Sequence, residues 1–404
     1  MFYNHENPTQ KSIYDNKILI VDDAMLNREL ITSFLKGAGY QNLAAAVDGA
    51  DALNQLNQHD IDLVILDLLM PNVSGTEVIK KVRTDARLKQ LPILVQTAIS
   101  DPEERAEAWK YGATDIITKP IHKLELLARV KVHLENSFLI RTLENYQKIA
   151  DHEVAKALEV QKSLLPSEEF LKQIGEKHNI SIDSIFIPSR FLSGDIWGLY
   201  ELEPGRLLVW ICDFSGKGIS ASLYTLRLHT LIAEHRHKLK DPSTLIHLVN
   251  LKLSEMVKEG HFCTFLVGVV DLNRMKFDYL SASATHPIIY CPSEKSYRLG
   301  DGSGLPLGIT KEATYPLKSL DLRPGDNLIL YSDLMWEDEG TIPEMSFLPE
   351  ELPGVIDRLQ GQSLLQMAKD KIQTSADIAF SDDLTLIEIV INPQEMKDVK
   401  IYKD

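Results

Sequence analysis

Four short apolar runs in the first 120 residues limit the possible folds of this chain more than any other feature. They occupy residues 17–21, 63–67, 92–97 and 115–119. Runs without alternating polar residues are typical of strands that are buried on both faces. The segments between them have helical spacing, and the first helix is predicted to end near Gly37. Strands alternating with helices predict an α/β domain with a doubly wound parallel sheet.

A long helix is predicted next, because residues 121–165 contain neither glycine nor proline. A helix of about 45 residues would be about 65 Å long at 1.5 Å per residue. Its apolar residues recur on a heptad seam: Leu139, Leu143, Tyr146, Ala150, Ala157, Val160 and Leu164. Glu153 interrupts the seam. Two alternatives therefore stay open: a dimeric coiled coil, and a helix that packs against its own domains.

Short strands mixed with helices follow Pro166. The predicted strands are 207–212, 264–271, 287–291, 327–331 and 384–390, and the predicted helices are 220–239 and 243–258. Pro-Gly turn signals separate the strands at 203–205 and 323–326. This pattern predicts an α+β domain, an antiparallel β-sandwich flanked by helices. The acidic segment 336–354 is predicted to be a surface loop.

The charge of the chain limits its partners. Acidic residues number 58 and basic residues 43, which leaves a formal charge of -15. Nucleic acids and anionic membranes need a basic surface, so we expect neither as a partner. No apolar run reaches 18 residues, and the three cysteines form no Cys-x-x-Cys pair. Together with a polar N-terminus, these features predict a reduced, cytoplasmic protein.

Acidic and polar residues stand at the ends of the first set of strands. Asp22 and Asp23 follow the run 17–21, Asp67 ends the run 63–67, Thr97 ends the run 92–97, and Lys119 ends the run 115–119. Because the carboxyl ends of parallel strands meet at one edge, we expect these five residues to lie together. Three carboxylates there need a divalent cation, and magnesium prefers such oxygen ligands. Lysine and threonine can neutralise and hydrogen-bond a phosphoryl group.

Residues 17–135 resemble a CheY-like response-regulator receiver domain. The acid pair, the acceptor Asp67, Thr97 and Lys119 stand at that family's spacing, as do Met70, Pro71, Gly75 and Pro120. The resemblance implies that Asp67 is the phosphorylation site and that Asp22, Asp23 and Asp67 hold magnesium. It further implies that Lys119 contacts the phosphoryl group, that Thr97 is the switch hydroxyl, and that a sensor histidine kinase or a phosphotransfer protein is the donor.

The receiver sequence departs from the family pattern in one respect. Ile116 stands where the family often has an aromatic residue, which argues against an aromatic switch but not against phosphorylation. We also expect the apolar side chains of Leu69 and Ile99 to exclude a hydrolytic water and to slow the loss of the phosphate.

A second group of acids occurs in the C-terminal half. Asp213 ends a strand and is followed by glycines, which let backbone carbonyls approach a metal. Asp195, Asp333 and the pair Asp382 and Asp383 also stand at strand ends or turns. Four such sites can hold two divalent ions about 4 Å apart, which activate a water as the nucleophile at neutral pH. Any one of these acids, taken alone, is explained as well by a turn.

Residues 155–393 resemble the PPM-type (protein phosphatase 2C-like) serine/threonine phosphatases, in the bacterial subclass that controls sporulation and stress sigma factors. The matching segments are 161–166, 194–195, 213–218, 264–271, 305–308, 331–333 and 382–385. The resemblance implies that Asp195 and Asp213 bridge two manganese or magnesium ions, assisted by the Phe214 carbonyl. Asp333 and Asp382 would complete the ligands of one ion.

Three departures from the phosphatase pattern bear on catalysis. Gly198 replaces an acid, Thr285 replaces a glycine, and Leu334 replaces a glycine. All four expected metal ligands are nevertheless present. Two alternatives follow: an active phosphatase, and a degenerate phosphatase-like adaptor that binds a sigma or anti-sigma factor under receiver control.

The predicted organisation is an N-terminal tail (1–16), a receiver domain (17–135), a helical linker (136–166), a phosphatase domain (167–393) and a C-terminal tail (394–404). We expect a two-component response regulator in which phosphorylation of Asp67 gates the phosphatase. The resemblance implies that the substrate is a phosphorylated anti-sigma-factor antagonist with a STAS fold. The long helix would make the protein a homodimer. The sequence leaves open the cognate kinase, the sigma system, the sign of the regulation and the choice between manganese and magnesium.

Overall fold

The computed structural model describes residues 13–98, 102–189, 192–216, 218–235, 241–257, 260–334, 363–374, 380 and 382–393. The chain forms two compact units, Met1–Ala150 and Asp151–Asp404. The C-terminal tail, the acidic loop expected at 336–354, and Ile99 lie outside the described residues, as does most of the N-terminal tail. No helix among the described residues is both long enough and apolar enough to cross a membrane.

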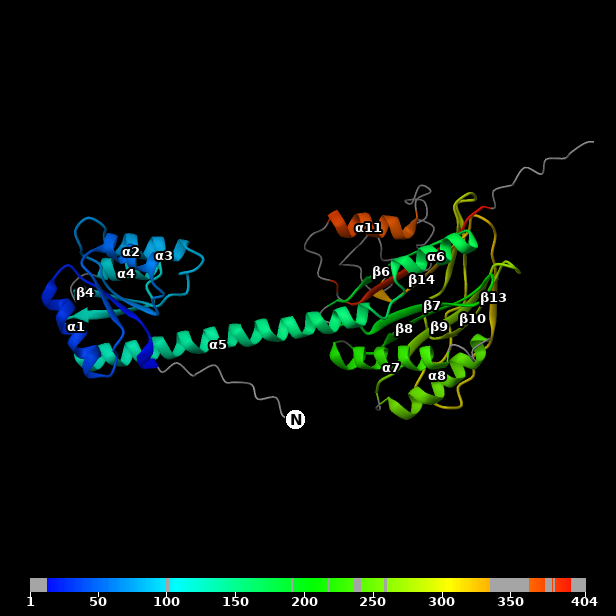
Figure 1. Cartoon of the computed structure of the whole chain (residues 1–404), viewed down its shortest axis with the longest axis horizontal. Coiled ribbons are helices and arrows are strands. Elements are labelled where there is room, and N and C mark those ends of the chain that lie inside the picture. The colour runs from blue at the N-terminus through cyan, green and yellow to red at the C-terminus, as the bar shows by residue number, and fades with distance from the viewer. Residues whose placement is uncertain are drawn as a thin grey trace, which may run out of the picture. The chain divides into compact units, whose positions relative to one another are not determined.

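The first unit contains a parallel sheet with helices around it (Figure 1). Its five strands lie in the order β2-β1-β3-β4-β5. The strands are β1 (Ile18–Val21), β2 (Leu43–Ala46), β3 (Leu63–Asp67), β4 (Ile93–Ala98) and β5 (Asp115–Lys119). Four of them follow the apolar runs of the sequence. The edge strand β2 contains three alanines, so its hydrophobic pattern is weak. The predicted doubly wound parallel sheet is confirmed.

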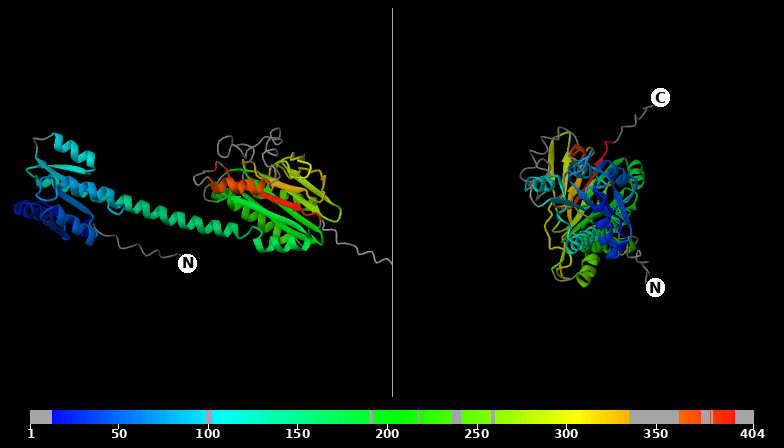
Figure 2. Two further views of the ribbon diagram at one scale, coloured as in Figure 1. Left: turned by 90° about the horizontal axis from the view of Figure 1, so that it is seen from above. Right: turned by 90° about the vertical axis from the view of Figure 1, so that its left-hand side faces the viewer.

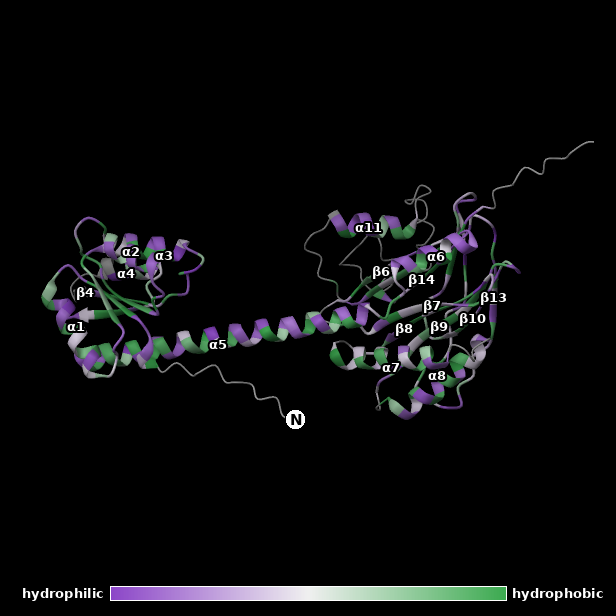
Figure 3. Cartoon of the chain, in the orientation of Figure 1, coloured by the Kyte–Doolittle hydropathy of each residue, from purple (hydrophilic) through white to green (hydrophobic). Residues whose placement is uncertain are grey.

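Helices cover both faces of this sheet. They are α1 (Met25–Gly37), α2 (Gly49–Gln58), α3 (Gly75–Thr84), α4 (Pro102–Tyr111) and α5 (Lys123–Lys162). Apolar residues of α1 and α5 pack on one face, and those of α2, α3 and α4 pack on the other. Figure 3 shows the resulting pattern, with hydrophobic strands inside and hydrophilic residues on the outer sides of the helices. Burial on both faces explains why the strands contain continuous apolar runs.

Ion pairs fasten α5 to the first unit. Arg129 and His133 both contact the Asp115 carboxylate, at 2.6 Å and 2.9 Å. Farther along the helix, Arg141 lies 2.7 Å from Asp62. Two residues of the predicted heptad seam remain largely in solvent, because Leu139 is 56% exposed and Leu143 is 68% exposed. The described chain therefore does not cover this part of the seam.

The second unit contains two antiparallel sheets. One has the order β13-β10-β9-β8-β7 and the other β12-β11-β14-β15-β6. The strands are β6 (Ile180–Ile187), β7 (Asp195–Glu203), β8 (Arg206–Phe214), β9 (Cys263–Asp271), β10 (Lys276–Ala282), β11 (Ile288–Cys291), β12 (Ser296–Leu299), β13 (Lys318–Asp321), β14 (Asn327–Tyr331) and β15 (Leu384–Ile391). The predicted α+β sandwich is confirmed.

Helices flank this sandwich (Figure 2). They are α6 (Glu168–His178), α7 (Ile219–His235), α8 (Pro242–Met256) and α11 (Leu364–Thr374). Helices α7 and α8 pack against the first sheet, and α6 and α11 contact β6 of the second. The apolar core between the sheets contains Trp197, Val209, Ile211, Leu330 and Ile389. Residues of β7 and β8 thus pack in this core, and these two strands carry Asp195 and Asp213.

Candidate functional site

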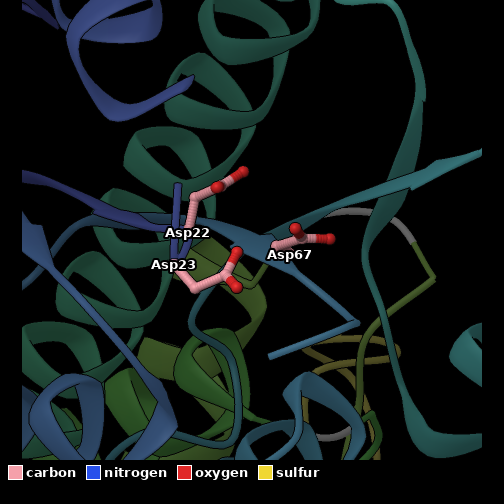
Figure 4. A group of neighbouring side chains, drawn as sticks. All are labelled: Asp22, Asp23 and Asp67. Carbon is pink, nitrogen blue, oxygen red and sulfur yellow. The ribbon is translucent and has the colours of Figure 1, made fainter. Parts of the chain in front are cut away.

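Three carboxylates meet at the carboxyl edge of the parallel sheet (Figure 4). Asp22 and Asp23 follow β1, and Asp67 ends β3. One oxygen from each side chain lies within 4.8 Å of the others. Asp22 and Asp67 are buried, whereas Asp23 is exposed. The structure therefore brings together the three acids that the sequence predicted to share one edge, and their all-oxygen donor set fits a magnesium ion.

Lys119, the last residue of β5, reaches two of these carboxylates. Its Nζ lies 2.6 Å from Asp67 Oδ2 and 3.2 Å from Asp22 Oδ2. Burial raises the pKa of Asp67 despite the neighbouring Lys119, and the charge of Asp22 adds to the rise. Burial alone would lower the pKa of Lys119, but its bonds to Asp67 and Asp22 outweigh burial and raise it. One lysine thus leaves the carboxylates incompletely compensated, which favours a bound cation.

Residues at the start of α1 orient the acid pair. Asn27 Nδ2 lies 3.0 Å from Asp22 Oδ2, and the backbone N–H of Ala24 donates to Asp22 Oδ1 at 2.9 Å. Arg28 Nη1 donates to the Asp22 and Asp23 carbonyls at 2.6 Å and 2.9 Å. These bonds hold the turn that follows β1.

The other receiver positions lie nearby. Thr97 is buried in β4, and its neighbouring strand residue is Thr118 of β5. Ile116 is only 5% exposed and packs in the core. Leu69 is 65% exposed, so its side chain is largely in solvent.

A pair of carboxylates defines the second site. Asp195 and Asp213 are directly opposite each other in the antiparallel ladder of β7 and β8. Asp195 is 1% exposed, and its Oδ2 is buried without a hydrogen-bond partner among the described residues. Burial raises the pKa of both carboxyls well above the usual range, and the charges of their acidic neighbours add to the rise. Such an arrangement is unfavourable for two anions alone and fits divalent cations.

Three further acids surround this pair. The charges of Asp333, Asp382 and Asp383 all raise the pKa of Asp213, which places them near it. Among the described residues, only the receiver site brings three carboxylate oxygens within 4.8 Å of one another. The described part of the second site contains no cluster of three that is equally tight. In the second site, Asp195 and Asp213 are thus paired across the ladder, with further acidic charge near Asp213.

Asp383 has a role that the sequence did not reveal. It is 5% exposed, and its two oxygens accept hydrogen bonds from the backbone N–H groups of Ser189, at 2.7 Å, and Gly194, at 2.6 Å. Asp383 thus holds the backbone that enters β7, next to Asp195. Adjacent aspartates before a strand are a visible signal, but the sequence does not show which of the two faces the backbone.

A close approach at Gly194 shapes the site. A Cβ at this position would stand 3.1 Å from the Phe214 carbonyl oxygen and 3.5 Å from Asp213 Oδ1. The carbonyl and the carboxylate therefore border the same point. Oxygen donors, a buried oxygen without a partner and this narrow approach together fit divalent ions. When bound, such ions supply an activated water and Lewis-acid stabilisation.

A pocket of about 380 Å³ adjoins the second site. Asp213 and Asp333 line it together with small polar residues, including Ser283, Thr285 and Ser303. A pocket lined by acids and by uncharged hydroxyl groups can admit a phosphorylated side chain once cations neutralise the acids.

The three departures from the phosphatase pattern have structural explanations. A Cβ at Gly198 would stand 2.6 Å from the Trp210 ring, so the indole occupies the space of a side chain there. The Thr285 hydroxyl donates to the Tyr331 carbonyl, two residues before Asp333. Leu334 is 6% exposed and packs in the apolar core with α11.

Comparisons with known proteins match segments of both units. The response regulator receiver domain family matches residues 18–131, and the Stage II sporulation protein E (SpoIIE) family matches residues 203–392. The chemotaxis protein CheY-3 of Vibrio cholerae is 39% identical over 104 residues, which cover 26% of this chain and 80% of that protein. A probable cyclic di-GMP phosphodiesterase of Vibrio cholerae is 36% identical over 139 residues, which cover 34% of this chain and 31% of that protein.

Two further comparisons concern a transcriptional regulator and the fold of the second unit. The phosphate regulon transcriptional regulatory protein PhoB of Escherichia coli is 36% identical over 115 residues, 28% of this chain and 50% of that protein. The chain thus spans half or less of the length of several curated relatives. The SiaA-PP2C domain of Pseudomonas aeruginosa matches with a TM-score of 0.52 at 17% identity, and the match covers 61% of this chain and 99% of that domain. This likeness shows a shared fold.

The five-stranded parallel sheet and the PP2C-like sandwich agree with these matches. The chain therefore belongs to the response-regulator family, with a receiver domain followed by a SpoIIE domain of the PPM type.

Proposed function

We propose that this protein is a response regulator whose output is a metal-dependent serine/threonine protein phosphatase, gated by phosphorylation of Asp67. The observation that carries the proposal is the pair of Asp195 and Asp213, opposite each other on β7 and β8. The buried Oδ2 of Asp195 has no partner among the described residues. The Phe214 carbonyl and Asp213 Oδ1 both lie close to the Cβ position of Gly194. An acid pair of this kind has little use in the fold without cations.

The chain's own residues have distinct roles in the proposed reaction. Asp195 and Asp213 would hold two manganese or magnesium ions, with Asp333 and Asp382 completing the ligands of one. The 380 Å³ pocket would admit the phosphoserine or phosphothreonine side chain. Hydrolysis forms a bond between a water oxygen and phosphorus and breaks the bond from phosphorus to the side-chain oxygen, which takes up a proton.

The receiver would control this reaction through α5. A sensor histidine kinase or a phosphotransfer protein would phosphorylate Asp67, with magnesium held by Asp22, Asp23 and Asp67. Lys119, which now lies 2.6 Å from Asp67, would contact the phosphoryl group, and Thr97 would bond to it. Such a change in charge alters receiver packing, and α5 runs without interruption from Lys123 to Lys162.

The proposed substrate is a phosphorylated anti-sigma-factor antagonist of the STAS fold, in a cytoplasmic partner-switching pathway. We also propose that the protein is a homodimer through α5, because the seam residues Leu139 and Leu143 are exposed in the single chain. The formal charge of -15 supports a protein partner over nucleic acid or an anionic membrane.

A second candidate function is a phosphatase-like adaptor without catalysis. Trp210 fills the space at Gly198, where the phosphatase pattern has an acid, and this observation favours the adaptor. The complete set of the four metal-binding acids opposes it.

Hydrolysis of an aryl phosphate with manganese tests the proposal. Wild type and Asp213→Ala are each assayed with and without beryllofluoride, which mimics the phosphoryl group on Asp67. We expect activity that needs Asp213 and changes with beryllofluoride. Asp278→Ala is the control, because this aspartate pairs with Arg274 on the surface. Inactivity of every protein, with retained binding of a partner protein, would instead support the adaptor.

A further inference from the structure

Gln161, in the last turn of α5, is buried in the second unit. Its side chain is only 1% exposed, although glutamine is among the residues that usually stay in water. A buried carboxamide must find partners for its oxygen and its amino group, since leaving them unpaired is costly. Its partners therefore show what this residue holds in place.

The Gln161 carboxamide forms hydrogen bonds with both backbone groups of Ser193. Its Oε1 accepts from the Ser193 N–H at 3.1 Å, and its Nε2 donates to the Ser193 carbonyl at 2.7 Å. Nε2 also lies 3.1 Å from the Thr225 hydroxyl in α7. Two bonds to the same residue fix its orientation as well as its position.

Ser193 is linked directly to the acid pair. The backbone N–H of Asp195 donates to Ser193 Oγ at 3.0 Å, and the Phe214 N–H donates to the Gly194 carbonyl at 3.2 Å. A shift of Ser193 therefore moves the Asp195 carboxylate relative to Asp213 and to the Phe214 carbonyl. Metal affinity is sensitive to such displacements, because the ligand oxygens must meet the ion at fixed distances.

We infer that Gln161 is a positioning residue for Asp195, and that its two hydrogen bonds to the Ser193 backbone set the affinity of the second acid site for divalent ions. The inference rests on the proposed function and deepens it, because it identifies the residue through which the end of α5 acts on the metal site. Gln161 does not touch the ions or the substrate; it acts through the backbone of residues 193–195.

The chain offers a matched control in Asn250 of α8. This carboxamide is also 1% exposed, accepts from the Gly308 N–H at 3.1 Å and donates to the Thr310 carbonyl at 2.8 Å. It thus holds a backbone segment in the same way, but that segment carries none of the acids. Loss of either carboxamide leaves buried backbone groups unpaired, so both variants are expected to lose thermal stability.

The test is manganese binding to the full-length chain, measured by isothermal titration calorimetry. All proteins carry Asp23→Asn, so that the receiver site does not contribute to the signal. We expect Gln161→Ala to raise the Kd for manganese tenfold or more, and Asn250→Ala to leave it within twofold. If Gln161→Ala does not fold, Gln161→Glu is measured by the same criterion, because it keeps the bond from the Ser193 N–H and loses the amino donor.

Equal Kd values for the two variants would overturn the inference, because the hydrogen bonds of Gln161 to Ser193 would then stabilise the fold without affecting metal binding. Wild-type binding that does not depend on Asp195, or no binding, would also overturn it. Failure of the proposed function looks different: manganese would bind through Asp195 and depend on Gln161, while no phosphoester is hydrolysed.

Discussion

Trp210 of β8 lies directly opposite Gly198 of β7, and its indole ring comes within 2.6 Å of the place where a Cβ of residue 198 would stand. Trp210 is 0% exposed, so the ring cannot move into solvent without disrupting the core. Glycine at 198 and tryptophan at 210 are therefore a complementary pair. The chain has filled this space with an apolar ring where the phosphatase pattern has a carboxylate.

We expect Gly198→Asp to destabilise the second unit rather than restore the phosphatase pattern. Overpacking costs about 1–3 kcal/mol, and burial of an unpaired carboxylate adds to this. Gly198→Ala should cost about 1–3 kcal/mol. Urea unfolding of each variant, alone and with Trp210→Phe, measures the effect. A double variant as unstable as the sum of the two single variants would show that the two positions are independent.

Manganese should stabilise the second unit only when Asp195 can ionise. In wild type, binding to the folded state adds about 2.7 kcal/mol at a metal concentration 100 times the Kd. Asp195→Asn should lose this gain and be more stable than wild type in EDTA, because burial raises the pKa of this carboxyl well above its usual range. Thermal unfolding with and without manganese, in the Asp23→Asn background, tests this. An equal manganese shift in both proteins would place the metal elsewhere.

In the receiver, Lys119→Met should expose the repulsion between Asp22 and Asp67. Removing one partner of a buried ion pair costs about 3–5 kcal/mol, and the Lys119 side chain is 27% exposed, so we expect about 2–3 kcal/mol. Magnesium should recover most of this loss by replacing the missing charge. Differential scanning calorimetry measures both effects, with exposed Lys110→Met as the control. A variant that stays destabilised in excess magnesium would argue against a cation among the three acids.

Because Glu388 is buried, we expect the stability of the second unit to depend on pH. Glu388 is 3% exposed in β15, accepts from Asn327 Nδ2 at 2.9 Å and contacts Ser363, the residue before α11. Burial raises its pKa, so the folded state binds the proton more tightly than the unfolded state. The associated stability is present below the unfolded pKa of about 4.3 and is lost as the pH rises through the higher folded pKa.

Glu388→Gln should remove this loss and make the second unit more stable than wild type at pH 7, by about 1 kcal/mol. Chemical unfolding at pH 4.5 and 7 measures the difference. Glu294→Gln serves as the control, because Glu294 pairs with Arg323 at the surface and should change stability by less than about 0.5 kcal/mol. A Glu388→Gln variant that tracks wild type at both pH values would contradict the prediction.

The proposed dimer depends on the exposed seam of α5. Leu143→Glu places a charge on this seam and should shift the protein from dimer to monomer, raising the dimer Kd by at least about tenfold. Lys148→Glu is the control, since Lys148 is exposed and lies off the seam. Sedimentation equilibrium distinguishes the two. Wild type that is already monomeric at micromolar concentration would rule out the dimer.

The receiver fold and its acid cluster were predictable from the sequence because both depend on local patterns. A strand buried on both faces has a continuous apolar run, and a parallel sheet brings the carboxyl ends of its strands to one edge. The direction of the strands is therefore enough to bring Asp22, Asp67 and Lys119 to the same edge of the sheet. The weak strand β2, with its three alanines, shows the limit of this reasoning.

The second site depended much more on tertiary structure. Asp195 and Asp213 are opposite each other because of the pairing register of β7 and β8, and a shift by one residue would turn every side chain to the other face. The partners of Gln161 and Asp383 lie 32 and 189 residues away in the chain. Local sequence patterns indicate which residues are candidate metal ligands, helix caps or core residues. Which backbone a buried polar group holds, and whether Trp210 fills the space at Gly198, is decided only when distant segments pack together.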